Sequence, residues 1–406
     1  MSRVTQVTAG GTRVTLPVGG CGMRVLVATT SAFGHVLPVV PLARAIRDAG
    51  HELLWATGSD GCGLVSAAGL PAEVAGMSEA DLVPVRKELR ERAPARPEEL
   101  AAFMFPNMFA AVRAPRMLDD LLPLARRWRP DVIVHEQGEL ASPLAAALIG
   151  VPSVTHGFGT AIPPPIVAAA AERVAPLWEA HQVEMPPYAG CFASPYLDPY
   201  PPSMQAGGAA HIPVVQLIRP VPYTGEVPAA LPPIVVRDDR PLLYLTLGTV
   251  NNDSAVFQRL LAPLRDLPIR LLVTVGPTGD PAALGPQPAH VAVERFVSQT
   301  AVLPHCDAVV SHAGSGTVLG ALALGLPQVC LPQAADQFRN SEAVARTGSG
   351  VVLRPDAVTP GSLVAAVQAV LGANAYRQRA AETAAEIAAM PAPDEVVPVL
   401  EAIAGS

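Results

Sequence analysis

The chain has 406 residues; 50% are hydrophobic, 16% are charged, and the formal net charge is −7. This length predicts about two domains, and the hydrophobic content excludes a disordered chain, which needs low hydrophobicity and high net charge. The acidic balance argues against nucleic acid as a partner, because a phosphate-backbone binder needs a basic surface.

The first 22 residues are polar and rich in Gly, Thr and Val, with no apolar core of signal-peptide type. We expect residues 1–22 to be a tail outside the fold, either disordered or the product of a start site placed too early. Five scattered cysteines predict a reduced, cytoplasmic protein. Two uncharged stretches, 140–171 and 313–335, are interrupted by glycine and proline, so neither predicts a stable membrane insertion.

Residues 23–218 are predicted to form a first α/β domain. Short apolar runs, typical of buried parallel strands, alternate with segments of helical spacing. The expected strands are 24–29, 52–57, 132–135 and 153–156, and the expected helices are 38–49, 140–149 and a longer region at 98–127 that is bent or broken at Pro106 and Pro115. Strands that alternate with helices imply a parallel sheet covered on both faces.

Residues 219–240 contain five prolines, at 220, 222, 228, 232 and 233, and a sixth follows at 241. This density predicts a stiff linker, since proline disrupts helices and central strands. A second α/β domain is predicted at 241–406, and its terminal helix could cross back to the first domain. The expected strands are 242–247, 270–275, 291–293, 308–311 and 328–331, and the expected helices are 255–264, 317–324 and the region after Pro360.

The sequence 311–317, Ser-His-Ala-Gly-Ser-Gly-Thr, lies between a predicted strand and a predicted helix. Its glycines would let the backbone approach a ligand closely, and the free N–H groups of the new helix would form an anion site. The spacing matches neither the dinucleotide fingerprint nor the P-loop. The turn by itself is equally consistent with a tight strand-to-helix connection that binds nothing.

A second strand end carries Asp336 and Gln337, whose side chains suit sugar hydroxyls. An Asp-Gln pair before a helix is more often an N-cap, but beside a phosphate turn a sugar-phosphate ligand becomes the better interpretation. Thr249 follows another strand and could donate to a phosphate. Phe296 and Val297 follow a third strand and could flank a flat base.

The segments 295–299, 311–317 and 332–340 occur in order with family-like spacing. They resemble the donor-binding signature of inverting, nucleotide-sugar-dependent glycosyltransferases with the GT-B fold, in which two doubly wound Rossmann-like domains face each other across a cleft. The chain is most similar to the actinobacterial enzymes that glycosylate antibiotics and other natural products. The resemblance extends from Met23 to about Gly350 and weakens at 59–127 and 163–216, where this family contacts acceptors.

The resemblance implies roles in donor binding. A dTDP-deoxysugar or UDP-glucose would be the co-substrate, and family members generally need no metal or other cofactor. The diphosphate would be held by His312, Gly314, Ser315, Gly316 and Thr317 with help from Thr249; the nucleobase and ribose by Phe296, Val297 and Gln299; and the sugar by Asp336 and Gln337.

The resemblance also implies a catalytic base at His35, because the family places its histidine at this Gly-His position after the first strand. A neutral imidazole can take a proton from a hydroxyl near pH 7. Glu136 ends a later strand where relatives often carry Asp, and it could orient the ring and stabilise the imidazolium. Apolar side chains offer candidates for acceptor binding, although ordinary core packing would also explain several of them: Phe33, Gly34, Phe103, Met104, Met108 and Phe158.

We therefore expect a metal-independent, inverting glycosyltransferase that acts on a hydroxyl of a hydrophobic natural product, as a monomer or homodimer. Alternatives on the same fold are a nucleotide-sugar epimerase and a cell-wall glycosyltransferase. An epimerase would need further acid/base residues near the sugar, and a cell-wall enzyme would need a basic or apolar docking surface. A non-catalytic nucleotide-sugar-binding auxiliary protein is a third alternative, and the presence of His35 counts against it.

Overall fold

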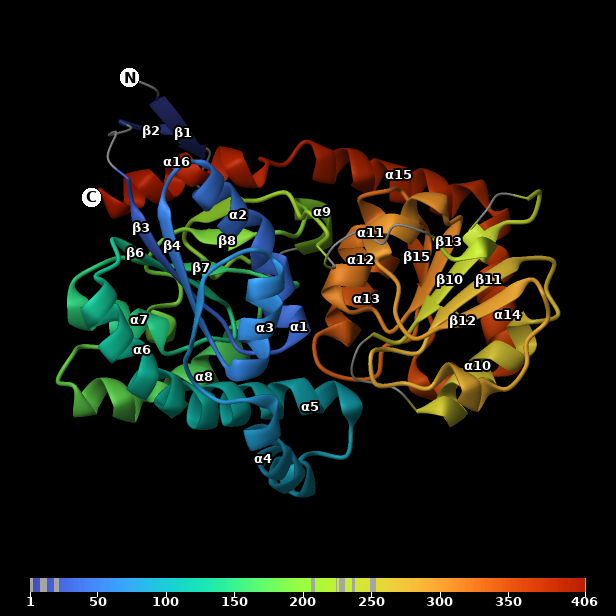
Figure 1. Cartoon of the computed structure of the whole chain (residues 1–406), viewed down its shortest axis with the longest axis horizontal. Helices are drawn as coiled ribbons and strands as arrows, with labels where there is room; N and C mark the ends of the chain where they lie inside the picture. The colour runs from blue at the N-terminus through green and yellow to red at the C-terminus, as the bar shows by residue number, and fades with distance from the viewer. Residues whose placement is uncertain are drawn as a thin grey trace. The chain divides into compact units, whose positions relative to one another are not determined.

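A computed structural model describes residues 3–7, 13–17, 22–205, 209–223, 225, 231–235, 238–248 and 253–405. The chain divides into two compact units (Figure 1). The first comprises Met1–Tyr200, Gly207–Arg219 and Met390–Ser406, and the second comprises Pro201–Ala206 and Pro220–Ala389.

The first unit is built on a seven-stranded parallel sheet with the order β5-β4-β3-β6-β7-β8-β9. The chain order reverses between β3 and β6, which is the point where doubly wound sheets bind ligands. The strands are β3 (Arg24–Ala28), β4 (Glu52–Thr57), β5 (Ala72–Val74), β6 (Val132–Glu136), β7 (Ser153–His156), β8 (Tyr196–Asp198) and β9 (Val215–Leu217).

Helices cover both faces of this sheet (Figure 1). They are α1 (Phe33–Val36), α2 (Val40–Asp48), α3 (Ser59–Ala67), α4 (Glu79–Arg92), α5 (Pro97–Met104), α6 (Ala114–Trp128), α7 (Ser142–Ile149), α8 (Pro164–Ala180) and α16 (Pro393–Ala404), with the short turns η1 (Leu37–Val39) and η3 (Pro187–Gly190). The core between sheet and helices is made mostly of Ala, Leu and Val side chains, as the scarcity of aromatic residues requires.

The helical region predicted at 98–127 is continuous but changes its pitch. A π-helix, η2 (Phe105–Arg113), lies between α5 and α6. Pro106 is in its first turn and Pro115 follows its end, so the two prolines mark the bounds of the irregular segment. Both remove a backbone N–H from the usual ladder. Wide turns of this kind are frequent at functional sites.

The second unit contains a six-stranded parallel sheet with the order β12-β11-β10-β13-β14-β15. Its chain order reverses between β10 and β13. The strands are β10 (Leu242–Thr246), β11 (Arg270–Thr274), β12 (Val291–Glu294), β13 (Ala308–Ser311), β14 (Gln328–Cys330) and β15 (Gly350–Val352). The core lies on both faces of the sheet.

Helices α10 and α14 pack together on one face of this sheet, and α11, α12, α13 and α15 contact one another on the other face. The helical elements are α9 (Pro202–Gln205), α10 (Ser254–Leu264), α11 (Gln299–Val302), α12 (Ser315–Leu322), α13 (Gln337–Thr347), α14 (Pro360–Gly372) and α15 (Asn374–Ala388), with the short turns η4 (Pro233–Val235), η5 (Pro281–Leu284), η6 (Leu303–His305) and η7 (Pro355–Ala357). The predicted α/β class is confirmed in each unit, since both sheets are parallel and doubly wound.

The predicted segment boundaries need two corrections. Within the expected tail, β1 (Arg3–Val7) and β2 (Arg13–Pro17) pair antiparallel in a separate two-stranded sheet, because both are short runs rich in Val and Thr. Residues 201–206 belong to the second unit. The last 17 residues belong to the first unit, where α16 packs on α2; a terminal helix that returns to the first domain was part of the expectation. Parts of the predicted linker lie outside the described residues.

Candidate active site

His35 and Glu136 lie at the carboxyl ends of β3 and β6, where the order of the first sheet reverses. Glu136 is the last residue of β6 and is fully buried. His35 lies on α1, and its Nδ1 is 3.0 Å from Oε1 of Glu136. Because an ionised carboxylate only accepts hydrogen bonds, Nδ1 carries the proton in this pair, and the lone pair is on Nε2. This is the tautomer that a general base requires.

The carboxylate of Glu136 has further donors. Both the backbone N–H and the hydroxyl of Thr30 donate to Oε1, at 3.3 Å and 3.0 Å, and the backbone N–H of Gly138 donates to Oε2. Burial by itself would raise the pKa of Glu136, but His35 and these hydrogen bonds more than offset it and lower that pKa. Glu136 is therefore ionised at neutral pH, and its negative charge faces the imidazole of His35.

Two aromatic rings hold the imidazole of His35. Phe158 meets it edge-on, with ring centroids 4.6 Å apart, and Phe109 lies 5.4 Å from it at a tilt of 35°. Phe33 and Gly34 are the first residues of α1 and are exposed. No heavy atom lies within 4 Å of the position that a Cβ on Gly34 would occupy. The backbone beside His35 is therefore open to an approaching molecule.

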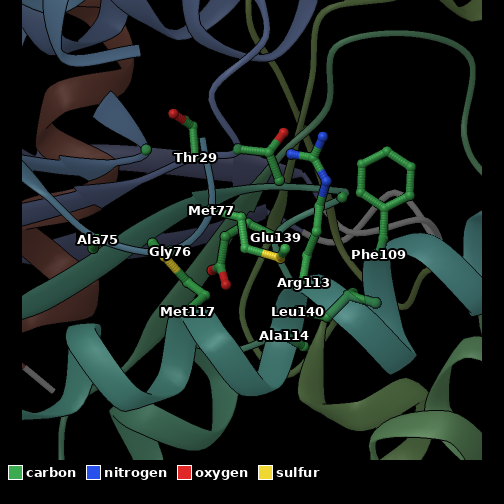
Figure 2. A pocket seen from close by; sticks show the side chains of 13 residues that line it. Thr29, Ala75, Gly76, Met77, Phe109, Arg113, Ala114, Met117, Glu139 and Leu140 are labelled. Atoms are coloured by element: carbon green, nitrogen blue, oxygen red, sulfur yellow. The ribbon is translucent and has the colours of Figure 1, made fainter. Parts of the chain in front are cut away.

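A pocket opens beside this pair, at the carboxyl ends of β3, β4, β5 and β6 (Figure 2). The space that it offers to a water-sized molecule is small, about 20 Å³, and the hollow opens to solvent. Its lining residues are Thr29, Thr30, Gly58, Ala75, Gly76, Met77, Phe109, Arg113, Ala114, Met117, Gly138, Glu139 and Leu140. None of these was predicted as a site residue, because they come from loops, from the π-helix η2 and from the start of α6, without a local motif.

The other acceptor candidates lie elsewhere. Met108 is buried with Leu82 and Leu89 in a cluster between α4 and η2, and Phe103 and Met104 pack against that cluster. None of the three methionine and phenylalanine candidates lines the pocket. Packing between helices explains their apolar spacing, and their role in acceptor binding stays a prediction.

In the second unit, His312 follows β13 at the point where the sheet order reverses, beside the end of β10. Its ring occupies the space beside two glycines. A Cβ built on Gly314 would lie 2.5 Å from Nε2 of His312, and a Cβ built on Gly248 would lie 2.6 Å from Cε1. Burial lowers the pKa of His312 to about 4, so the ring is neutral at pH 7. Its Nδ1 is buried and has no hydrogen-bond partner in the described part of the chain.

The turns after β13 and β14 are joined by side chains. Ser315, the first residue of α12, donates to Asp336 at 2.8 Å. The side-chain amide of Asn340 donates to Ser315, to Asp336 and to the backbone oxygen of Ala313, at 3.0 Å, 2.8 Å and 3.0 Å. Asn340 is fully buried, and only its place at the end of segment 332–340 could have indicated its role. These bonds hold the two predicted donor turns as one body.

Both turns also contain a strained alanine. Ala313 and Ala335 have φ angles of 64° and 54°, in the left-handed region that ordinarily favours glycine. Strain of this kind persists where the surrounding structure requires it, and it clusters at binding sites. The N-terminus of α12 begins directly after Ala313 and Gly314.

The remaining donor candidates have different surroundings. Gln299 and Thr317 are hydrogen-bonded to each other at 3.1 Å, Phe296 is 49% exposed, and Val297 is buried in the core. The side chain of Gln337 accepts from the backbone N–H groups of residues 333 and 334, at 2.8 Å and 3.0 Å, which is a structural role. Gly316 is exposed, and no heavy atom lies near the position of its Cβ. Thr249 lies outside the described residues.

The described ranges contain no cluster of three or more His, Cys, Asp and Glu side chains that could hold a metal ion. Among the helices that the structure describes, none combines the length and apolar character needed to cross a membrane.

Two family domains match the chain. Residues 44–233 match the N-terminal domain, and residues 258–403 the C-terminal domain, of the family described as erythromycin biosynthesis protein CIII-like. The chain belongs to this family. It is a glycosyltransferase of the actinobacterial natural-product class, which confirms the resemblance inferred from its donor motif.

This glycosyltransferase is similar to characterised relatives over nearly its whole length. It is 33% identical to the elloramycin glycosyltransferase ElmGT of Streptomyces olivaceus, over 92% of this chain and 96% of that protein. The crystal structure of the glycosyltransferase SnogD from Streptomyces nogalater has a TM-score of 0.76 and 32% identity, covering 95% of this chain and 100% of that one. The glycosyltransferase SsfS6 of Streptomyces sp. SF2575, complexed with thymidine diphosphate, has a TM-score of 0.77 and 29% identity, covering 93% and 99%.

Proposed function

We propose that this glycosyltransferase transfers a sugar from a dTDP-linked donor to a hydroxyl of a hydrophobic natural-product aglycone, with inversion at the sugar carbon. The observation that carries the proposal is the contact between His35 and the buried, ionised carboxylate of Glu136. The structure of SsfS6 with thymidine diphosphate supports the choice of nucleotide. A relative named TDP-daunosamine transferase, 28% identical, supports it as well.

His35 acts as the general base in this proposal. Its Nε2 takes the proton of the acceptor hydroxyl, while Glu136 stabilises the imidazolium that forms. The acceptor oxygen forms a bond to C1 of the sugar, and the bond between C1 and the diphosphate oxygen breaks on the opposite face. The electron pair of that bond leaves with the diphosphate. Attack from the opposite face inverts the configuration at C1.

The leaving diphosphate would be held without a metal ion. The N-terminus of α12 offers free N–H groups and the positive end of the helix dipole. His312 is neutral and can donate one N–H, and its buried Nδ1, unpartnered in the described structure, is consistent with a ligand contact. Preorganised donors of this kind can offset the charge that a metal would otherwise meet. Asp336 remains the candidate for the sugar hydroxyls, whereas the side chain of Gln337 is already engaged.

The variant His35→Ala tests the base. We expect turnover of dTDP-glucose with a panel of naphthols to fall by roughly 10²–10⁴-fold, while calorimetric binding of dTDP is unchanged. His181→Ala is the matched control, because His181 is exposed at the end of α8. Full turnover in His35→Ala would overturn the proposed role of His35.

Nucleotide titrations test the donor site. Binding of dTDP, UDP and GDP is compared by calorimetry, with and without Mg²⁺, in the wild-type protein and in His312→Ala. We expect dTDP to bind to the wild-type protein without Mg²⁺. In His312→Ala we expect the affinity for dTDP to be strongly reduced. A requirement for Mg²⁺ would contradict the metal-independent mechanism, and equal binding in the variant would remove His312 from the donor site.

A further inference from the structure

Arg113 is a buried cation in the wall of the pocket beside His35 (Figure 2). It is the last residue of the π-helix η2, and its side chain is only 9% exposed. Its ion-pair partner is Glu79, and the contact from a terminal nitrogen is long, at 3.4 Å. The Nε atom is buried and has no hydrogen-bond partner among the described residues. Burial lowers the pKa of this guanidinium, so the charge is costly in the empty pocket.

Glu79 pairs with two cations, Arg113 and Arg86. Its second oxygen accepts a hydrogen bond from Arg86, and the oxygen that faces Arg113 also accepts one from the hydroxyl of Ser31, at 3.1 Å. Two arginines therefore share one carboxylate. The third carboxylate near the pocket, Glu139, accepts from the backbone N–H groups that begin α7. The charges of Glu79 and Glu136 both attract the guanidinium of Arg113, but its Nε–H stays without a hydrogen-bond partner among the described residues.

The rest of the pocket is mostly apolar. Ala75, Met77, Phe109, Ala114, Met117 and Leu140 contribute apolar side chains to its wall. A cation in such a wall suits a ligand with an apolar body and one acidic oxygen. Because the guanidinium has a fixed fork of donors, it favours planar, delocalised anions such as carboxylates.

The ring of Phe109 lies near both the guanidinium of Arg113 and the imidazole of the proposed base, His35. The guanidinium carbon of Arg113 lies 5.3 Å from the centre of the Phe109 ring, and that ring centre lies 5.4 Å from the centre of the His35 ring. Arg113 and His35 therefore cannot be farther apart than these two distances taken together. A fused aromatic ring system can span this separation, with one oxygen at each end.

We infer that Arg113 determines acceptor specificity by binding an anionic oxygen of the acceptor, such as a carboxylate, phenolate or enolate, while a separate hydroxyl of the same molecule reaches His35. The inference rests on the proposed function and extends it: the acceptor is an acidic, apolar molecule rather than a neutral one. Phe109 lies between the two polar ends and packs against the acceptor body.

The test compares a hydroxynaphthoic acid with its methyl ester, which differ in one negative charge at neutral pH. We expect the wild-type protein to bind the acid at least about tenfold more tightly by calorimetry. In Arg113→Met this ratio falls to about one, and in Arg113→Lys it is intermediate. Arg116→Met is the matched control, because Arg116 is on the next turn and is 59% exposed. An unchanged ratio in Arg113→Met, or no binding of either probe to the wild type, would overturn the inference.

Further readouts separate specificity from a structural role. Methionine has a similar length, and Glu79 keeps its ion pair with Arg86 when Arg113 is replaced, so the melting temperature of Arg113→Met should not fall. A loss of stability with equal weakening of acid and ester would instead assign Arg113 a structural role. Glu79→Gln removes the shared carboxylate, and should raise the preference for the acid.

Sugar transfer from dTDP-glucose to the same probes is measured separately. Transfer without acid preference overturns the inference and leaves the proposed function standing. Acid preference without transfer from any dTDP-sugar supports the anion site and overturns the proposed function.

Discussion

The imidazole of His35 and the carboxylate of Glu136 are 101 residues apart in the chain and meet at 3.0 Å. Glu136 reaches the ring from a fully buried position at the end of β6, and Thr30, two residues after the end of β3, donates two hydrogen bonds to the same carboxylate oxygen. The contact exists because β3 and β6 are neighbours at the reversal point of the sheet. At this distance the negative charge of Glu136 can stabilise a protonated His35 ring, in addition to accepting its hydrogen bond.

Replacing Glu136 by Gln tests that charge. An amide can still accept the hydrogen bond from Nδ1, but it cannot stabilise an imidazolium as a carboxylate does. We expect kcat to fall by roughly 10²-fold or more, with dTDP affinity unchanged. Steady-state kinetics and calorimetry measure these effects. Glu88→Gln, at a side chain that is 69% exposed, is the control; a parallel loss of dTDP binding would make Glu136 structural.

A pair of glycine variants tests the packing of His312. In Gly314→Ala the new Cβ would overlap the ring of His312, because the two positions are 2.5 Å apart. We expect the ring to be displaced, the melting temperature to fall and dTDP binding to weaken. Gly316→Ala, two residues later in α12, has open space at its Cβ and should be neutral or stabilising by up to about 1 kcal/mol. Equal melting temperatures for the two variants would contradict the crowding around Gly314.

Stability should fall in mild acid because three histidines are held neutral: His135 and His156 are buried, and His312 is partly buried. Burial lowers the pKa of His135, His156 and His312 to about 4, below their ordinary 6.5. Between these values the unfolded chain takes up protons that the folded chain does not, so the free energy of unfolding decreases as the pH falls from 6.5 to 4. The loss is at most about 3 kcal/mol per residue. Burial raises the pKa of Glu139 to about 7, and this group works in the opposite direction, losing stabilisation as the pH rises from 4.5 through 7.

Urea unfolding at a series of pH values measures this dependence. His312→Gln should make the decline between pH 6.5 and pH 4 shallower, because it removes one of the three groups. His181→Gln, at an exposed position, should leave the decline unchanged. A free energy of unfolding that stays level or rises towards pH 4 would show that these rings are not held neutral.

The terminal helix α16 should contribute to the stability of the first unit. Leu400 is fully buried on this helix, which packs against α2, and His51 contacts Glu401 at 3.1 Å. We expect Leu400→Ala to lower the free energy of unfolding by about 2–5 kcal/mol. Leu324→Ala, at a side chain that is 48% exposed, should cost little. Similar effects from the two substitutions would mean that α16 does not depend on this buried contact.

Much of the fold was readable from local patterns. The strands at Glu52–Thr57, Ser153–His156 and Ala308–Ser311 coincide with the predicted ranges, because each is an apolar run bounded by turn residues. Pro106 and Pro115 correctly marked the irregular part of a long helix. The three-residue strands β5, β8, β9 and β15 were not predicted, since so short a segment carries little periodicity, and only β14 was recognised at that length.

The donor turn could be found from sequence because its residues are consecutive: glycines, small hydroxyl residues and a histidine stand between one strand and one helix. Asn340, Thr30 and Arg113 could not be found in this way. Each acts through side-chain contacts with residues that are distant in sequence, and those contacts depend on which strands are neighbours in the sheet. Periodicity and motif spacing describe a segment and its nearest neighbours along the chain. Which group pairs with a buried charge depends on which strands end side by side at one edge of the sheet. His35 and Glu136 meet because β3 and β6 are such neighbours.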